Sequence, residues 1–75
     1  MTFNQFLHLI KPGMIVDIYF KSAFYNNVKS VVILSNENEE LYYQCKFSNK
    51  YASYDSISQV SIYIKPSLSN IKVII

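Results

Sequence analysis

The sequence is poor in the residues from which most active sites are built. It contains one glycine, one cysteine, one histidine and no tryptophan, and its seven basic residues are all lysines. A single glycine excludes a glycine-rich phosphate-binding loop, and one cysteine with one histidine excludes a zinc site of several Cys and His ligands. The lone Cys45 can form no intramolecular disulfide, so a reducing cytoplasm is the expected setting.

The few reactive side chains are also badly placed for catalysis. Nucleophilic catalysis needs a nucleophile and a base within hydrogen-bond reach. His8 falls on the polar face of a predicted helix, and Cys45 falls on the apolar face of a predicted strand, where a thiol is usually an inert small hydrophobe. The acidic residues Glu37, Glu39 and Glu40 lack a calcium-loop pattern and are typical of a solvated hairpin tip. We therefore expect no enzymatic activity, no metal and no cofactor.

No segment has the character of a leader peptide or a membrane span. The apolar stretch of residues 3–10 is interrupted by Asn4, Gln5 and His8, lacks a basic flank and runs into Pro12. It is also too short to cross a bilayer. We expect no membrane association.

The composition that remains is that of one small folded domain, residues 1–75. Apolar residues make up 51% and aromatic residues 16% of the chain, which excludes disorder. Most of these residues are Ile, Val, Tyr and Phe, which favour β-strands. A chain of this length buries only about 60% of its unfolded surface, so its core is thin.

The first segment predicts an amphipathic helix over residues 2–11. Thr2 and Gln5 match a capping box, in which each side chain satisfies a backbone N–H group of the other residue. Pro12 then ends the helix. The apolar positions recur at helical spacing and form one stripe, which must pack on another element because so short a helix is unstable alone: Phe3, Phe6, Leu7 and Ile10.

The rest of the chain predicts about five short strands, with residues 48–56 as a polar loop. The expected strands are residues 14–20, 28–35, 40–47, 58–64 and 70–75. The fold class is therefore α+β, mostly β: a short N-terminal helix packed on a strongly bent antiparallel sheet or a small, partly open barrel. SH3-like and Sm-like barrels share this plan, but no motif of either is present, so the likeness is architectural only.

Alternation along the strands predicts which side chains face the core. Pointing inward are Val16, Ile18, Leu41, Tyr43, Cys45, Phe47, Val60, Ile62 and Ile64. Asp17 and Ser61 fall on the outward side. In the second strand Val31 and Ile33 face away from Val28, Val32 and Leu34, which leaves one apolar side without a cover.

One candidate binding surface is rich in tyrosine. Outward positions on the strands hold Tyr19, Tyr42, Gln44, Lys46 and Tyr63, and the predicted loops beside them hold Tyr25, Tyr51 and Tyr54. Three explanations stay open: tyrosines that only pack across the sheet, a protein contact, or a surface that stacks single-stranded bases. The small net charge of +2 and the absence of arginine favour a protein partner over nucleic acid.

A second candidate surface consists of the uncovered apolar residues Val31, Ile33 and Ile74. Either the sheet curls enough to bury them, or a second copy of the chain covers them in a homodimer.

Together these patterns predict a small, non-enzymatic binding module that acts through protein–protein contact, as an inhibitor or adaptor. Size and composition resemble those of many phage and mobile-element anti-defence proteins, an analogy that suggests this kind of role. The alternative is a single-stranded nucleic-acid-binding protein that uses the same tyrosines together with Lys29, Lys46 and Lys50.

Overall fold

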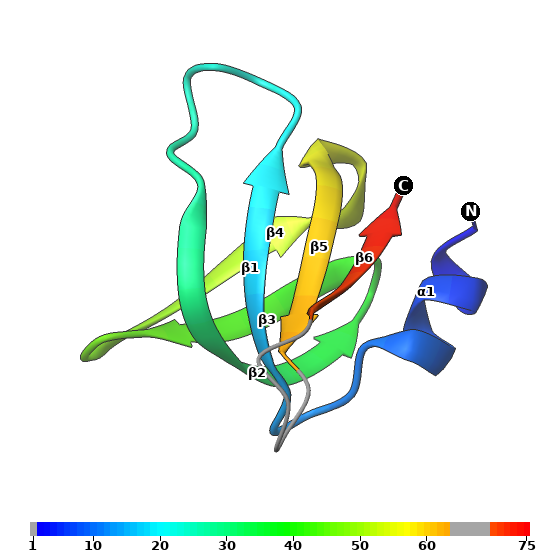
Figure 1. The fold of residues 1–75 in the computed structure, drawn as a ribbon, viewed down its shortest axis with the longest axis horizontal. Helices are drawn as coiled ribbons and strands as arrows, with labels where there is room; N and C mark the ends of the chain where they lie inside the picture. Colours follow the sequence, from blue (N-terminus) through cyan, green and yellow to red (C-terminus); the bar gives the residue numbers. More distant parts are fainter. Residues whose placement is uncertain (1, 64–69) are drawn as a thin grey trace.

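The computed structural model describes residues 2–63 and 70–75, which form one helix, six strands and a short 3-10 turn. The elements are α1 (Phe3–Leu9), β1 (Ile15–Phe20), β2 (Val28–Glu37), β3 (Glu40–Cys45), β4 (Ser48–Ser53), η1 (Tyr54–Ser56), β5 (Ile57–Tyr63) and β6 (Asn70–Ile74). The strands pair antiparallel in the order β4-β3-β2-β1-β5-β6 (Figure 1). The predicted fold class is confirmed, and the sheet is open, with β4 and β6 at its edges.

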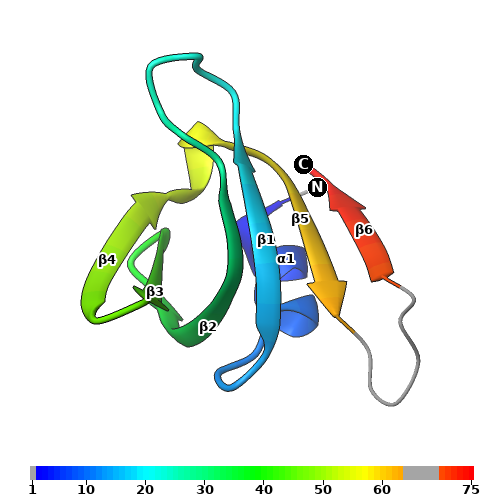
Figure 2. The same ribbon diagram turned by 60° about the vertical axis from the view of Figure 1, so that its left-hand side comes forward.

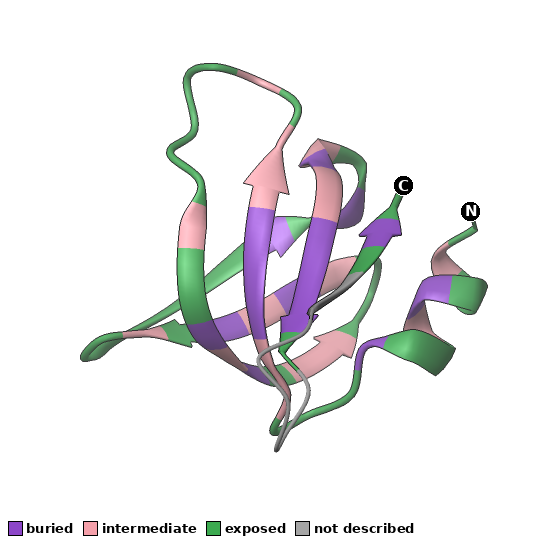
Figure 3. Ribbon diagram, viewed as in Figure 1, coloured by how far each residue is buried: buried purple, intermediate pink, exposed green. Residues whose placement is uncertain are grey.

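The sheet is strongly bent, and α1 lies against its concave side (Figure 2). Buried residues follow this concave side along the central strands and the inner face of the helix (Figure 3). Phe6 and Ile10 of the helix segment are fully buried, and Phe6 packs edge-on against Tyr54 at 5.1 Å between ring centroids. The core that results comprises Phe6, Ile10, Val16, Ile18, Val31, Ile33, Leu41, Tyr43, Ala52, Tyr54, Ile57, Val60, Ile62 and Val73.

The helix forms as its sequence predicts, within the expected range of residues 2–11. The Gln5 N–H donates to Thr2 Oγ1 at 3.2 Å, and the Thr2 N–H donates to Gln5 Oε1 at 2.9 Å, which completes the capping box. The chain leaves helical geometry at Ile10, where φ is −104°. The apolar stripe supplies two fully buried side chains, Phe6 and Ile10, and Phe3 is partly buried against the core.

A β-bulge in β2 changes which side chains face the core. Val16 pairs with Val31 and Ile18 pairs with Val28, so β2 holds one more residue than β1 between the two pairs. Ser30 lies in this extra stretch with a φ of +55°. Val28 and Val31, predicted on opposite faces, therefore both pack toward the concave core.

This bulge corrects the predicted oligomer interface. Val31 and Ile33 are each 1% exposed and belong to the chain's own core, so they are unavailable to a second copy in this fold. The sequence left them uncovered because strict alternation along β2 ignores the bulge. Ile74 is 63% exposed, as that prediction requires.

Two tight turns join the central and edge strands. Glu37 pairs with Glu40 around Asn38 and Glu39, whose φ values are +53° and +57°, so the second strand runs past its predicted end at residue 35. Cys45 pairs with Ser48, which makes Lys46 and Phe47 the next turn. The prediction that Phe47 points inward is wrong: the strand ends at Cys45, and the Phe47 side chain is fully exposed.

The main error of the sequence analysis lies in residues 48–56, predicted as a loop. Six of them form β4, paired with β3 along its whole length, and the other three form η1. The composition of β4, Ser-Asn-Lys-Tyr-Ala-Ser, hides it because only Ala52 is buried. The expectation that Ile64 points inward concerns a residue outside the described ranges. Within the described ranges, no helix is long and apolar enough to cross a membrane.

Candidate functional site

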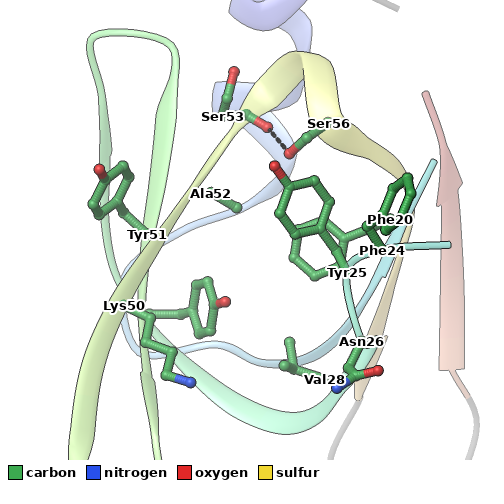
Figure 4. A pocket seen from close by; sticks show the side chains of 11 residues that line it. Phe20, Phe24, Tyr25, Asn26, Val28, Lys50, Tyr51, Ala52, Ser53 and Ser56 are labelled. Atoms are coloured by element: carbon green, nitrogen blue, oxygen red, sulfur yellow. Dashed lines mark hydrogen bonds between the residues drawn. The ribbon is translucent and has the colours of Figure 1, made fainter. Parts of the chain in front are cut away.

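A cleft of about 550 Å³ opens between β4 and the loop that joins β1 to β2 (Figure 4). This volume falls within the range of about 300–1,000 Å³ that is typical of ligand-binding pockets. We call it the aromatic cleft. The described residues that line it are Phe20, Phe24, Tyr25, Asn26, Val28, Tyr43, Lys50, Tyr51, Ala52, Ser53 and Ser56.

Five of these lining residues carry aromatic rings, and three of the rings are open to solvent. Phe24 is 97%, Tyr25 59% and Tyr51 65% exposed. Phe20 supports Tyr25 from behind, with 5.7 Å between the ring centroids. Tyr43, buried in the core, also lines the cleft. The loop rings Phe24 and Tyr25 thus lie across an open space from β4, whereas the Tyr51 ring lies on the far side of β4 and points away from that space (Figure 4).

Hydrogen bonds at its base hold the loop wall of the cleft in place. The Phe20 N–H donates to Asn27 Oδ1 at 3.0 Å, and the Lys21 N–H donates to the Ser56 carbonyl at 2.9 Å. Farther out, Ser22 accepts the Phe24 N–H at its hydroxyl (3.1 Å) and the Tyr25 N–H at its carbonyl (3.3 Å). The loop is therefore tied to the end of β1 and to η1, which positions Phe24 and Tyr25 opposite β4.

The backbone edge of β4 forms the other wall of the cleft. Lys50, Tyr51, Ala52 and Ser53 are consecutive and all line the cleft. Side chains of a strand alternate between its two faces, so a cavity that lay over one face would be lined by every second residue. Consecutive residues show that the cleft meets the strand at its backbone edge.

The aromatic cleft has a single charged lining residue among those described. That residue is Lys50, and no aspartate or glutamate lines the space. The cleft therefore suits a neutral or anionic occupant. Burial raises the pKa of the Tyr43 hydroxyl above its ordinary value of 10.0, with a smaller contribution from the nearby Cys45 thiol, so Tyr43 stays neutral at physiological pH.

The structure separates the tyrosines that the sequence grouped as one surface. Tyr51 lines the aromatic cleft, and Tyr42 lies beside it on β3, with 5.8 Å between their ring centroids. Tyr54, predicted in an exposed loop, belongs to the core, where it packs edge-on against Phe3 at 5.3 Å and against Phe6. Its burial is a correction: η1 turns the ring under α1, so Tyr54 is not part of a partner surface.

The remaining predicted binding residues lie elsewhere. Gln44 and Lys46 are exposed, on β3 and on the turn after it, and Tyr19 is half-buried on β1. Tyr63 donates its hydroxyl to the carboxylate of Asp17 at 2.8 Å. Asp17 does fall on the outward side of β1, as predicted, yet it is only 5% exposed.

Sequence reasoning missed the loop wall of the site. Phe24 was not assigned to the binding surface, and Tyr25 was placed only in a loop beside it, although two adjacent aromatic residues within a polar turn region were the available signal. Lys50 was predicted to take part only in the alternative function, nucleic-acid binding. Nothing in the sequence placed the segment of Lys50 to Ser53 opposite the loop, because that depends on the pairing of β4 with β3.

The described residues contain no group of three or more His, Cys, Asp and Glu side chains that could hold a metal ion. His8 is exposed on α1, and Cys45 is partly buried against the core. Comparison with known proteins finds no family model, no curated protein and no solved structure that matches this chain.

Proposed function

We propose that this chain is a non-enzymatic protein-binding module and that the aromatic cleft is its binding site. The observation that carries the proposal is the pair of exposed loop rings, Phe24 and Tyr25, which line an open space of about 550 Å³ opposite β4 (Figure 4). The Phe24 ring, 97% exposed, buries almost no surface and so contributes little to the stability of the fold. Aromatic residues are the residue type from which the energetic centres of protein interfaces are built.

The architecture of the site also suits binding rather than turnover. The lining offers rings, amides, hydroxyls and one ammonium group, and none of these is a strong general base at neutral pH. A module of this kind acts by occupying a surface of its partner, which is how a small inhibitor or adaptor works.

Binding of single-stranded nucleic acid is the second candidate, favoured by the contact between Tyr42 and Tyr51 next to Lys50. Adjacent rings can stack bases while lysines follow the backbone. Of the three lysines that this alternative invokes, only Lys50 lines the cleft; Lys29 and Lys46 do not. The protein-binding proposal therefore takes precedence.

The test is a selection of random displayed peptides on the immobilised full chain, followed by affinity measurements with the recovered peptides. Phe24→Ala and Tyr25→Ala are expected to weaken binding by at least tenfold each. Phe47→Ala is the matched control, since Phe47 is equally exposed but does not line the cleft. Circular dichroism is expected to show all three variants folded. Peptides that bind these variants as tightly as the wild type contradict the proposal.

The same preparation separates the two candidates. Fluorescence anisotropy with a single-stranded oligonucleotide is expected to show no binding at low salt. Binding that weakens steeply with added salt and is lost in Tyr51→Ala supports the nucleic-acid function and refutes the protein-binding one.

A further inference from the structure

The edge of β4 that faces the aromatic cleft carries unused backbone hydrogen-bonding groups. Cys45 and Ser48 flank a two-residue turn and form a hydrogen-bonded pair, and such pairs alternate with non-bonded pairs along an antiparallel ladder. Asn49, Tyr51 and Ser53 therefore direct their N–H and C=O groups away from β3. Among the described hydrogen bonds, none uses the outward groups of Asn49 or Tyr51.

This open edge has a defined end. The Ser56 hydroxyl donates to the Ser53 carbonyl at 2.7 Å, which occupies the last acceptor of the row (Figure 4). The available row thus runs from Asn49 to the Ser53 N–H, a length that pairs with about three to five residues of an extended chain. The cleft beside it provides the space that such a chain would fill.

Side chains along β4 define what that chain must carry. Lys50 and Ala52 are two residues apart and share one face of the strand. Ala52 is 6% exposed at the inner side of the cleft, whereas Lys50 is exposed. On an added strand, the residue opposite Ala52 would enter the apolar part of the cleft. The residue two positions away would lie opposite the Lys50 ammonium, where a carboxylate is the complementary group.

We propose that an extended segment of the partner protein binds as an additional β-strand along β4, with an acidic residue facing Lys50 and an apolar residue two positions away in the aromatic cleft. This inference rests on the proposed function and names its ligand class. The backbone pairing supplies affinity, and the two side chains supply specificity.

A second copy of the chain fits this edge poorly. β4 contains Lys50 and no acidic residue, and Lys46 lies in the adjoining turn. Two β4 edges paired with each other would bring positive charges together with no counter-charge, and lysine on an edge strand generally opposes pairing between copies. Pairing of β4 with the β4 of a second copy is therefore unfavourable, and a segment that carries an acidic residue is the better complement.

The first test is a charge reversal. Random nine-residue peptides with phenylalanine fixed at the central position are selected in parallel on the full chain, on Lys50→Glu and on Lys46→Glu. The wild type is expected to enrich Asp or Glu two positions from the phenylalanine, and Lys50→Glu is expected to enrich Lys or Arg there. Lys46→Glu, the control, is expected to keep the acidic preference. An unchanged preference in Lys50→Glu overturns the pairing with Lys50.

The second test examines the backbone. The best wild-type peptide is resynthesised with single N-methyl groups at successive positions, each of which removes one N–H donor. Loss of affinity of about tenfold is expected at alternating positions only, because every second amide of an added strand faces β4. Equal affinity of all N-methylated peptides overturns strand addition.

The outcomes distinguish a failure of strand addition from a failure of the protein-binding site itself. Peptides that depend on Phe24 but tolerate every N-methyl group refute strand addition and leave the protein-binding cleft in place. Peptides that bind Phe24→Ala as well as the wild type refute both.

Discussion

Replacement of Asp17 by alanine tests the physical account of the bulge on which the core depends. One carboxylate oxygen of Asp17 accepts the Ser30 N–H at 2.8 Å, and the Tyr63 hydroxyl donates to both carboxylate oxygens at 2.8 and 3.0 Å. Ser30 occupies the bulge with a φ of +55°, so its N–H does not take part in the regular hydrogen bonding between β1 and β2. Asp17 is the group that satisfies it, and this holds the bulge that turns Val31 inward.

The expected cost follows from these bonds. Each hydrogen bond to a charged group contributes about 1.5–3 kcal/mol, and both donors lie on partly exposed residues, so water recovers part of the loss. We expect Asp17→Ala to lower the free energy of unfolding by about 2–3 kcal/mol. A domain of this size has a total of about 4–11 kcal/mol. The melting temperature should therefore fall by about 10–20 °C.

Urea unfolding followed by circular dichroism measures this change. Tyr63→Phe removes only one donor and is expected to cost about 1 kcal/mol. The double variant should cost less than the sum of the two single variants, because the partners share a bond. A loss below about 0.5 kcal/mol in Asp17→Ala would refute the role assigned to the carboxylate.

Three further predictions concern a turn, the helix cap and the pH dependence of stability. Glu39→Gly should raise the free energy of unfolding by about 0.5–1 kcal/mol, because Glu39 has a φ of +57° that glycine adopts without strain; Glu39→Ala, which loses the same charge, should bring no gain in urea unfolding. Thr2→Ala should cost about 1 kcal/mol by removing the cap of α1, and a loss near zero in the same assay would contradict that role. Burial raises the pKa of Tyr43, so the unfolded chain loses the hydroxyl proton at a lower pH than the folded chain does. The free energy of unfolding should therefore fall as pH rises above about 10. Tyr43→Phe should show a shallower decline between pH 8 and 11, and identical pH profiles would contradict the assignment.

The parts of the fold that the sequence predicted are those in which local chemistry and burial agree. The capping box of Thr2 and Gln5 and the apolar stripe of α1 specify the same helix, and the structure contains it. Strict alternation likewise identified the buried faces of β1 and β5. Each of these signals lies within one short segment.

The errors arise where pairing between segments overrides the local pattern. β4 is polar because one edge and most of its side chains face solvent, so its strand conformation depends on its ladder with β3. In β2 the bulge at Ser30 shifts the alternation by one residue and reverses the predicted environment of Val31 and Ile33. Neither the ladder nor the bulge has a distinctive sequence signature.

The candidate site could be predicted only in part for the same reason. Tyr51 was recognised as an accessible aromatic residue, but the position of β4 opposite Phe24 and Tyr25 depends on how the β1–β2 loop and β4 meet in space. Tyr54, three residues from Tyr51 and of the same type, lies in the core instead. Composition alone does not distinguish these two tyrosines.

Amide hydrogen exchange at Tyr51 shows whether a bound chain pairs with the open edge of β4. Its N–H faces the cleft and has no partner among the described residues. The Lys50 N–H, in contrast, donates to β3, because Lys50 and Tyr43 form a hydrogen-bonded pair of the ladder. With a saturating selected peptide, the account predicts that exchange at the Tyr51 amide slows by at least tenfold, measured by NMR on the full chain. Exchange at Tyr51 that is unchanged while the peptide is bound would contradict it.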